Sequence, residues 1–164
     1  MLKLIPITDI PDHAIYEMLQ EIGQNENGFH NKACGMSYEE YAYWLKHEYA
    51  VDCGLIEDWM VPQTSYWLYD DDQPVGYGRL RHALNDALRQ HSGHIGYAIA
   101  SSKRGKGYGN AILSLLLEES KKLGLSEVQV SANCDNLLSN LVILHNGGFL
   151  VRSEECKNFY KILL

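Results

Sequence analysis

The chain has 164 residues, a length typical of one domain, and we expect a single domain over residues 1–164. Hydrophobic residues make up 46% of the chain and charged residues 21%, which excludes general disorder because disordered chains are poor in apolar residues. The net charge is −7, so the chain lacks the overall positive field that attracts nucleic acid or anionic lipid.

Features that would direct the chain out of the cytoplasm are missing from the sequence. No apolar run approaches the ~20 residues that a membrane-spanning helix needs, and residues 1–6 do not resemble a signal peptide. The four cysteines are widely spaced and form no C-x-x-C pair, which argues against a disulfide framework or a zinc site. We therefore expect reduced thiols, no metal and a cytoplasmic location, without a membrane or nucleic-acid partner.

The first third of the chain predicts helices separated by polar segments. Ser37 and Glu40 form a capping-box pattern before a run of aromatic and apolar residues, which predicts that a helix begins there. The expected elements are a strand over 2–7, a helix between Asp12 and Gly23, a loop over 24–35, a helix from Ser37 and an irregular segment over 52–63.

The remaining chain predicts a hairpin and then alternating strands and helices. The expected elements are strands over 64–69 and 75–81 joined by a turn, a short helix over 84–90, a strand over 93–100, a helix over 106–123, a strand over 127–132, a helix over 136–146, and strands over 149–152 and 158–164. This order indicates an α/β domain with a mixed α+β sheet. The strand–helix–strand unit over 93–132 predicts two roughly parallel strands joined by a right-handed crossover.

One segment carries the clearest chemical signal. Three glycines stand at alternate positions, Gly105, Gly107 and Gly109, between a strand and a helix. Without Cβ atoms, their backbone N–H groups can converge on a small volume, and the helix adds its unpaired N–H groups and the positive end of its dipole. Lys103, Arg104 and Lys106 add positive charge. The segment therefore predicts a phosphate or pyrophosphate site.

Two common nucleotide motifs do not fit this loop. A Walker A loop needs Lys-Ser or Lys-Thr after its last glycine, but Tyr108 follows Gly107. A dinucleotide-binding fingerprint needs the spacing G-x-G-x-x-G, whereas the spacing here is G-x-G-x-G.

The pattern R-x-x-G-x-G formed by Arg104, Gly107 and Gly109 resembles the pyrophosphate signature of the GNAT superfamily of acyl-CoA-dependent N-acyltransferases. Two further segments share the resemblance: 93–97, which is similar to the family's fourth strand, and Asn136 with the later Gly147-Gly148-Phe149, which is similar to its second cofactor segment and next strand. The resemblance covers the chain from about Thr64 to its end. It implies six to seven strands flanked by about four helices, with the central strands splayed.

The resemblance also implies acetyl-CoA as co-substrate, bound through its pyrophosphate at the glycine loop and through its pantetheine arm along the fourth strand. The residues it assigns to acetyl-CoA are Tyr97, Ile99, Arg104, Gly105, Lys106, Gly107, Tyr108, Gly109, Asn136 and Ser139. The reaction it implies is direct attack of a primary amine on the thioester in a ternary complex. A homodimer is compatible with the resemblance.

The catalytic acid that many family members carry is missing here. Its position, four residues before the glycine of the Gly-Phe pair, is Leu144. Tyr108, His145 or Tyr97 could replace it, and His94 stands where many members carry Glu and could act as a base. We take His94, Tyr108 and His145 as candidate catalytic residues, although an edge residue bonded to the backbone is the commoner explanation for either histidine.

The resemblance implies that the acceptor is an amine on a small molecule or a peptide, and two groups of residues are candidates for binding it. Glu57 and Trp59 lie where the family usually builds its acceptor wall, and an acidic-aromatic pair suits a cation, although a solvated loop fits equally well. Arg81 and His82, next to Arg79, could hold an acidic acceptor, but exposed charge on a strand is the commoner explanation.

Two other functions stay open. One is an acyl-CoA-binding sensor or regulatory module that keeps the cofactor site without turnover. The other is a phosphate-binding α/β protein unrelated to CoA.

Overall fold

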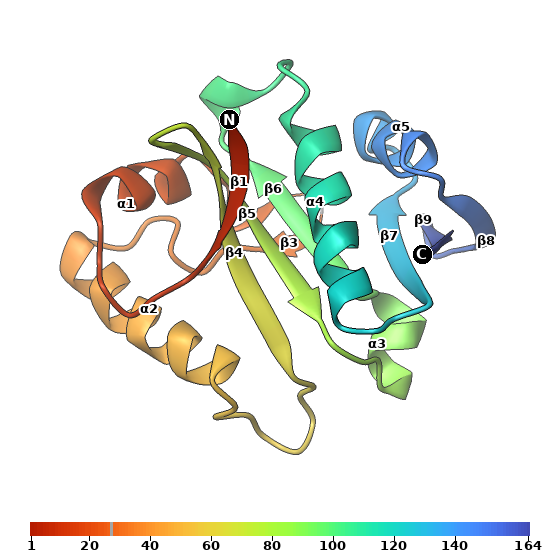
Figure 1. Cartoon of the computed structure of the whole chain (residues 1–164), viewed down its shortest axis with the longest axis horizontal. Helices are drawn as coiled ribbons and strands as arrows, with labels where there is room; N and C mark the ends of the chain where they lie inside the picture. The colour runs from red at the N-terminus through yellow and green to blue at the C-terminus, as the bar shows by residue number, and fades with distance from the viewer. Residues whose placement is uncertain (27) are drawn as a thin grey trace.

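The computed structural model describes residues 1–26 and 28–164, which form two larger antiparallel sheets standing side by side (Figure 1) and one small two-stranded sheet. The first sheet has the strand order β1-β4-β5-β6, and the second has the order β7-β9-β8. The strands are β1 (Leu2–Pro6), β2 (Asn25–Glu26), β3 (Phe29–His30), β4 (Gln63–Asp70), β5 (Gln73–Arg81), β6 (Ile95–Ile99), β7 (Glu127–Asn133), β8 (Phe149–Glu154) and β9 (Lys157–Leu163). The α-helices are α1 (His13–Gln20), α2 (Tyr38–Asp52), α3 (Asp86–His91), α4 (Tyr108–Lys122) and α5 (Leu137–His145).

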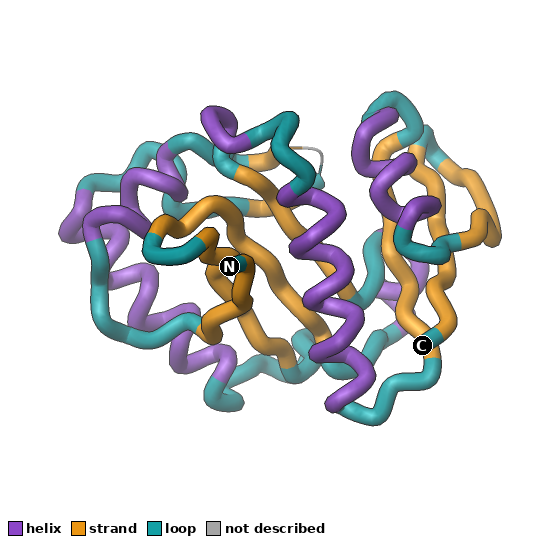
Figure 2. Tube along the Cα trace, turned by 45° about the horizontal axis from the view of Figure 1, so that its top comes forward, coloured by secondary structure: helices purple, strands orange, loops and turns teal. Residues whose placement is uncertain are grey.

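Helices cover the first sheet on both faces, because successive large apolar residues of its strands point to opposite faces of the sheet. On β4, Trp67 joins the buried cluster that includes α1 and α2, while its neighbour Leu68 joins the cluster that includes α4. The glycines of β5 allow α4 to lie close to the sheet, since a Cβ atom at Gly78 would stand 3.0 Å from Leu116 Cδ1. Helix α4 runs along the junction of the two sheets (Figure 2).

Strands β6 and β7 meet at one end only. The backbone N–H of His94 donates to Gln129 O at 2.8 Å, and the N–H of Gln129 donates to His94 Nδ1 at 2.9 Å. Gly93 is necessary at this contact, because a Cβ atom there would stand 2.3 Å from Gln129 O. Beyond this point β6 and β7 share no ladder of hydrogen bonds and belong to different sheets. The predicted splay of the central strands is therefore confirmed, and its pivot lies at Gly93.

The mixed α/β fold and the order of its elements are also confirmed, although the described residues contain nine strands and five α-helices where the resemblance implied six to seven strands and about four helices. Two segments also differ from their expected structure. The segment 24–35, expected as a loop, contains the short antiparallel pair β2 and β3 and buries Phe29. The helix expected from residue 106 begins at Tyr108, because Gly107 adopts a left-handed conformation with φ of +84° and stands at the N-cap. No helix in the described residues has the length and hydropathy to cross a membrane.

Candidate functional site

A cavity of about 1100 Å³ lies at the splay between the two sheets. Its walls come from β5, β6, β7, the glycine loop, α5 and the segment around β3. Strand β6 crosses it from Ile95 to Ile99, four residue steps that span about 13 Å at ~3.3 Å each. The glycine loop lies at the Ile99 end, and Arg81 lies at the Ile95 end, where its backbone N–H donates to His94 O at 2.7 Å.

The free edge of β6 faces this cavity. Ala100 N–H donates to Val75 O and His94 O accepts from Arg81 N–H, so the even-numbered residues bond to β5. Because backbone polar groups alternate sides along a strand, those of the odd-numbered residues, including Tyr97 and Ile99, turn away from β5 toward the splay. Ile99 O already accepts from Arg104 Nε at 3.1 Å, so among the described residues the edge offers the Tyr97 N–H and C=O and the Ile99 N–H to an extended ligand.

The glycine loop presents a run of free amides at the other end. Gly105 and Gly107 have φ of +75° and +84°, which L-residues rarely adopt. The first backbone N–H at the start of α4 with an acceptor is that of Ala111, which donates to Gly107 O at 3.1 Å. Among the described residues, the N–H groups of 105–110 have no hydrogen-bond acceptor. Together with the helix dipole, they form a site for an anion.

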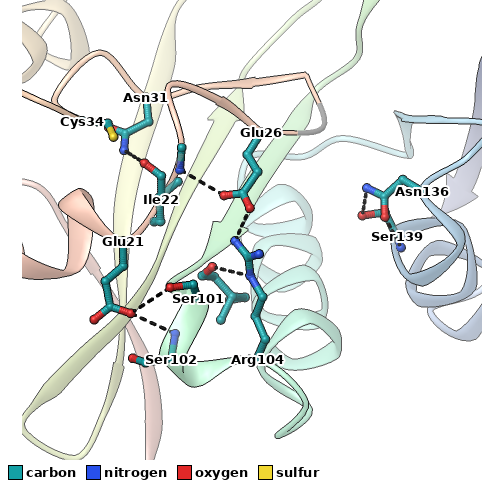
Figure 3. A network of polar contacts seen from close by, with 12 residues as sticks. Glu21, Ile22, Glu26, Asn31, Cys34, Ser101, Ser102, Arg104, Asn136 and Ser139 are labelled. Atoms are coloured by element: carbon teal, nitrogen blue, oxygen red, sulfur yellow. Dashed lines mark hydrogen bonds and ion pairs between the residues drawn. The ribbon is translucent and has the colours of Figure 1, made fainter.

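Side chains from the segment between α1 and β3 contact residues 101–104, which precede the glycine loop (Figure 3). Arg104 turns toward the β2 segment, where its Nη2 stands 2.6 Å from Glu26 Oε1, and its Nε donates to Ile99 O at 3.1 Å. Glu21 accepts hydrogen bonds from the Ser102 backbone N–H at 2.9 Å and from Ser101 Oγ at 3.2 Å. These hydrogen bonds lower the pKa of Glu21, so the carboxylate stays charged at neutral pH.

Helix α5 supplies the opposite wall. Asn136 caps this helix: its Oδ1 accepts the Ser139 N–H at 3.3 Å and its Nδ2 donates to Ser139 Oγ at 2.8 Å. Both residues line the cavity, across the splay from Arg104 (Figure 3). Tyr97 also lines it, and its buried hydroxyl has no hydrogen-bond partner in the described part of the chain. Burial raises the pKa of Tyr97 to about 12, so the hydroxyl keeps its proton at neutral pH.

The three candidate catalytic residues lie in different places. His94 is at the pivot, outside the cavity lining, with its Nδ1 accepting from the backbone; burial and the neighbouring arginines lower its pKa. Tyr108 lines the cavity, but its hydroxyl donates to Asp70 Oδ2 at 2.6 Å, which raises its pKa. His145 lines the cavity from the end of α5 and is exposed. The structure thus brings Tyr108 and His145 to the cavity wall, and their catalytic roles stay predictions.

Among the candidate acceptor residues, Arg81 lines the cavity and the other three do not. Trp59 is 71% exposed, and its Nε1 donates to Glu57 Oε2 at 3.1 Å on the surface segment after α2. His82 Nε2 lies 2.8 Å from Thr64 Oγ1. A role for Glu57, Trp59 or His82 in acceptor binding stays a prediction. Among the cofactor residues, Lys106 lies outside the lining, while its backbone N–H belongs to the free run.

The sequence analysis did not predict several of the lining residues, three of which come from distant segments of the chain. Phe29 and His30 reach the cavity from β3, and Lys157 reaches it from the start of β9. Phe29 could have been found from the sequence, because it is a single large aromatic residue in an otherwise polar stretch.

Comparison with known proteins identifies the family. A model of the acetyltransferase (GNAT) family matches residues 16–140, more than half of the chain. The chain belongs to the GNAT acetyltransferase family. The search of curated protein sequences found no match.

Solved structures of GNAT proteins share the fold over nearly the whole chain. The microcin C7 self-immunity acetyltransferase MccE, solved with acetyl-CoA and AMP, has a TM-score of 0.74 at 14% identity and covers 99% of this chain and 92% of its own. RimL, the ribosomal L7/L12 α-N-protein acetyltransferase solved with CoA, has a TM-score of 0.74 at 16% identity, covering 99% and 94%. Campylobacter jejuni PseH, solved with acetyl-CoA, has a TM-score of 0.62 at 12% identity, covering 99% of both chains.

Proposed function

We propose that this GNAT protein transfers the acetyl group of acetyl-CoA to a primary amine by direct attack in a ternary complex. The observation that carries the proposal is the run of free amides at residues 105–110, at one end of a cavity whose wall is the unpaired edge of β6. A pyrophosphate accepts hydrogen bonds from converging N–H groups, and an extended amide-containing arm can pair with a free strand edge.

The residues present fit acetyl-CoA in charge as well as in hydrogen bonding. Lys103 and Arg104 line the loop end of the cavity, although the whole chain is acidic. Tyr97 and Ile99 would hold the arm through their backbone groups, and Asn136 and Ser139 would bound it on the α5 side. Acetyl-CoA supplies the acetyl group as a thioester when it is bound.

Two groups of the chain suit the acyl transfer itself. A backbone N–H on the free edge of β6 can stabilise negative charge that develops on the thioester oxygen. The Tyr97 hydroxyl is protonated and has no hydrogen-bond partner within the described residues, so it can donate a hydrogen bond to the departing thiolate and stabilise its charge. Tyr97 suits this role better than Tyr108, whose proton is directed to Asp70. His145 stays a second candidate for the acid, and His94 a candidate base acting through water.

The alternative, a sensor without turnover, makes a different prediction. The test is release of free CoA thiol from acetyl-CoA in the presence of a panel of primary amines, together with calorimetric binding of acetyl-CoA. The proposal predicts amine-dependent thiol release and an acetylated amine detected by mass spectrometry. Tight binding without release for every amine would support the sensor. Displacement of acetyl-CoA by inorganic pyrophosphate and simple nucleotides with equal affinity would support a phosphate-binding protein instead.

Direct attack requires that the reaction forms no covalent acetyl-enzyme intermediate. Cys34, Cys53, Cys134 and Cys156 are free thiols. Intact-mass analysis of the chain with acetyl-CoA and no amine should show no added acetyl group. A stable adduct on any of the four thiols would contradict the ternary-complex mechanism.

A cytoplasmic location and a homodimer also stay predictions.

A further inference from the structure

The end of the cavity away from the glycine loop is strongly basic. Arg79, Arg81 and Lys157 line the cavity here. Glu26 is the one carboxylate among the described lining residues, and it is paired with Arg104 at the other end. A net charge of −7 makes this concentration of positive charge on one wall a specific feature of the site.

Arg81 keeps donor capacity for a ligand. Its Nη1 donates to Gly93 O at 2.8 Å and to Ser92 Oγ at 3.2 Å, which fixes the guanidinium beside the pivot. No carboxylate of the described residues lies within ion-pair distance of it, and its Nε and Nη2 have no protein partner there. A guanidinium held on one side with its other donors free can bind a planar carboxylate.

Arg79 adds to the positive charge beside Arg81, because it lies two residues earlier on β5 and on the same face of the sheet. Its Nη2 donates to Tyr77 Oη at 3.0 Å and stands 3.8 Å from Glu48 Oε2 on α2, too far for a strong hydrogen bond. Its Nε is buried and has no partner in the described part of the chain. Two arginines thus share one side of β5: Arg79 forms an ion pair with Glu48, and Arg81 has no ion-pair partner among the described residues.

The Arg81 end of the cavity lies at a distance along β6 from the pyrophosphate site that leaves room for an acceptor. The pyrophosphate site lies at the Ile99 end, and the Arg81 end lies about 13 Å away along the strand. Arg79 and Arg81 also lie on the α2 face of the first sheet, whereas Tyr97 joins the cluster around α4 on the opposite face. An acceptor can therefore reach the splay from the arginine face while the co-substrate occupies the other.

We propose that the acceptor is an amine that carries a carboxylate, and that Arg81 binds this carboxylate while the amine faces the splay. The inference rests on the proposed acetyl transfer and narrows its substrate class. Arg79 is a positioning residue that supports Arg81 through its charge.

The test compares matched acceptors in the CoA-release assay. The panel contains α-amino acids and ω-amino carboxylates of two to six carbons, each with its carboxamide and its phosphonate counterpart, and short peptides with and without a free carboxylate. The wild-type chain should prefer carboxylates over carboxamides by about tenfold or more in kcat/KM, mainly through KM, since hydrogen bonds to charged groups are the strong ones. The peptide arm distinguishes a free amino acid from a peptide as the source of the carboxylate.

Variants separate recognition from a structural role. Arg81→Gln should lower the carboxylate-to-carboxamide ratio about tenfold and leave kcat/KM for the carboxamides nearly unchanged, and Arg81→Lys should recover part of the ratio. Arg89→Gln, which alters an arginine paired with Asp86 outside the cavity lining, is the matched control and should leave the ratio unchanged. Because the ratio is compared between variants, differences in amine pKa within each acceptor pair cancel.

Several outcomes would overturn the inference while acetyl transfer stands. These are a wild-type ratio near one, an Arg81→Gln effect equal for all acceptors, or a preference for phosphonates over carboxylates. The wild-type panel decides the matter even where Arg81→Gln fails to fold. Absence of CoA release with every amine, despite acetyl-CoA binding, would refute the proposed function and the inference together.

Discussion

Gly93 fixes the pivot of the splay, and replacing it with alanine tests whether the structure depends on that contact. The added Cβ would lie 2.3 Å from Gln129 O, 2.9 Å from Gln129 C and 3.3 Å from Val130 Cα. Since ordinary C···O contacts begin near ~3.3 Å, β6 and β7 must separate by about 1 Å. All three contacts are with backbone atoms, so no side-chain rotation can relieve the clash.

The expected cost has two parts. Overpacking of a close contact costs about 1–3 kcal/mol, and weakening the two hydrogen bonds between His94 and Gln129 adds about 1 kcal/mol. Gly93→Ala should therefore lower the free energy of unfolding by about 2–4 kcal/mol, measured by urea denaturation, and weaken acetyl-CoA binding. Gly23→Ala is the control, because its Cβ would meet nothing closer than 3.6 Å. A Gly93→Ala variant within about 0.5 kcal/mol of the wild type would refute this account of the pivot.

Three other predictions concern the site. The Cβ atom of Gly107→Ala would meet no atom of the described residues within 4 Å, but alanine would be forced to φ of +84°. The substitution should therefore cost about 1–2 kcal/mol of stability and weaken CoA binding in calorimetry; unchanged affinity would contradict a loop built for pyrophosphate. Tyr97→Phe should lower kcat about 10²-fold with little change in the KM for acetyl-CoA, and an unchanged kcat would exclude Tyr97 as the hydrogen-bond donor to the thiolate. The pKa of His94 is lowered in the folded state, so its contribution to stability is present above its unfolded pKa of about 6.5 and is lost as the pH falls below that value. Relative to His94→Asn, the wild type should thus lose stability on acidification from pH 7 to 5, and parallel pH profiles would contradict the shift.

The parts of the site that depend on local sequence could be predicted. The glycine spacing at 105–109 fixes the backbone of the loop, and a Gly-containing strand before it indicates a close backbone approach, which the structure places at Gly93. These features need only neighbouring residues, so one sequence is enough to show them.

The parts that depend on packing between distant elements could not be predicted. Arg79 and Arg81 on a strand suggest a solvated face, and their burial follows only once α2 and the segment around β3 cover that face. Likewise, the polar stretch 24–35 shows no periodicity, and Phe29 becomes a cavity residue because it packs under Gly96 of β6. The role of Tyr97 depends on the burial of a hydroxyl that the alternation of β6 alone does not determine.

The central claim is that the free amides around Lys106 bind a pyrophosphate. The most direct measurement is a titration of the ¹⁵N-labelled chain with CoA, followed by amide resonances in two-dimensional NMR, with pantetheine as the ligand that lacks the pyrophosphate. The account predicts that the amide signals of residues 105–110 shift strongly with CoA and little with pantetheine. Saturating CoA binding that leaves those signals in place would contradict it.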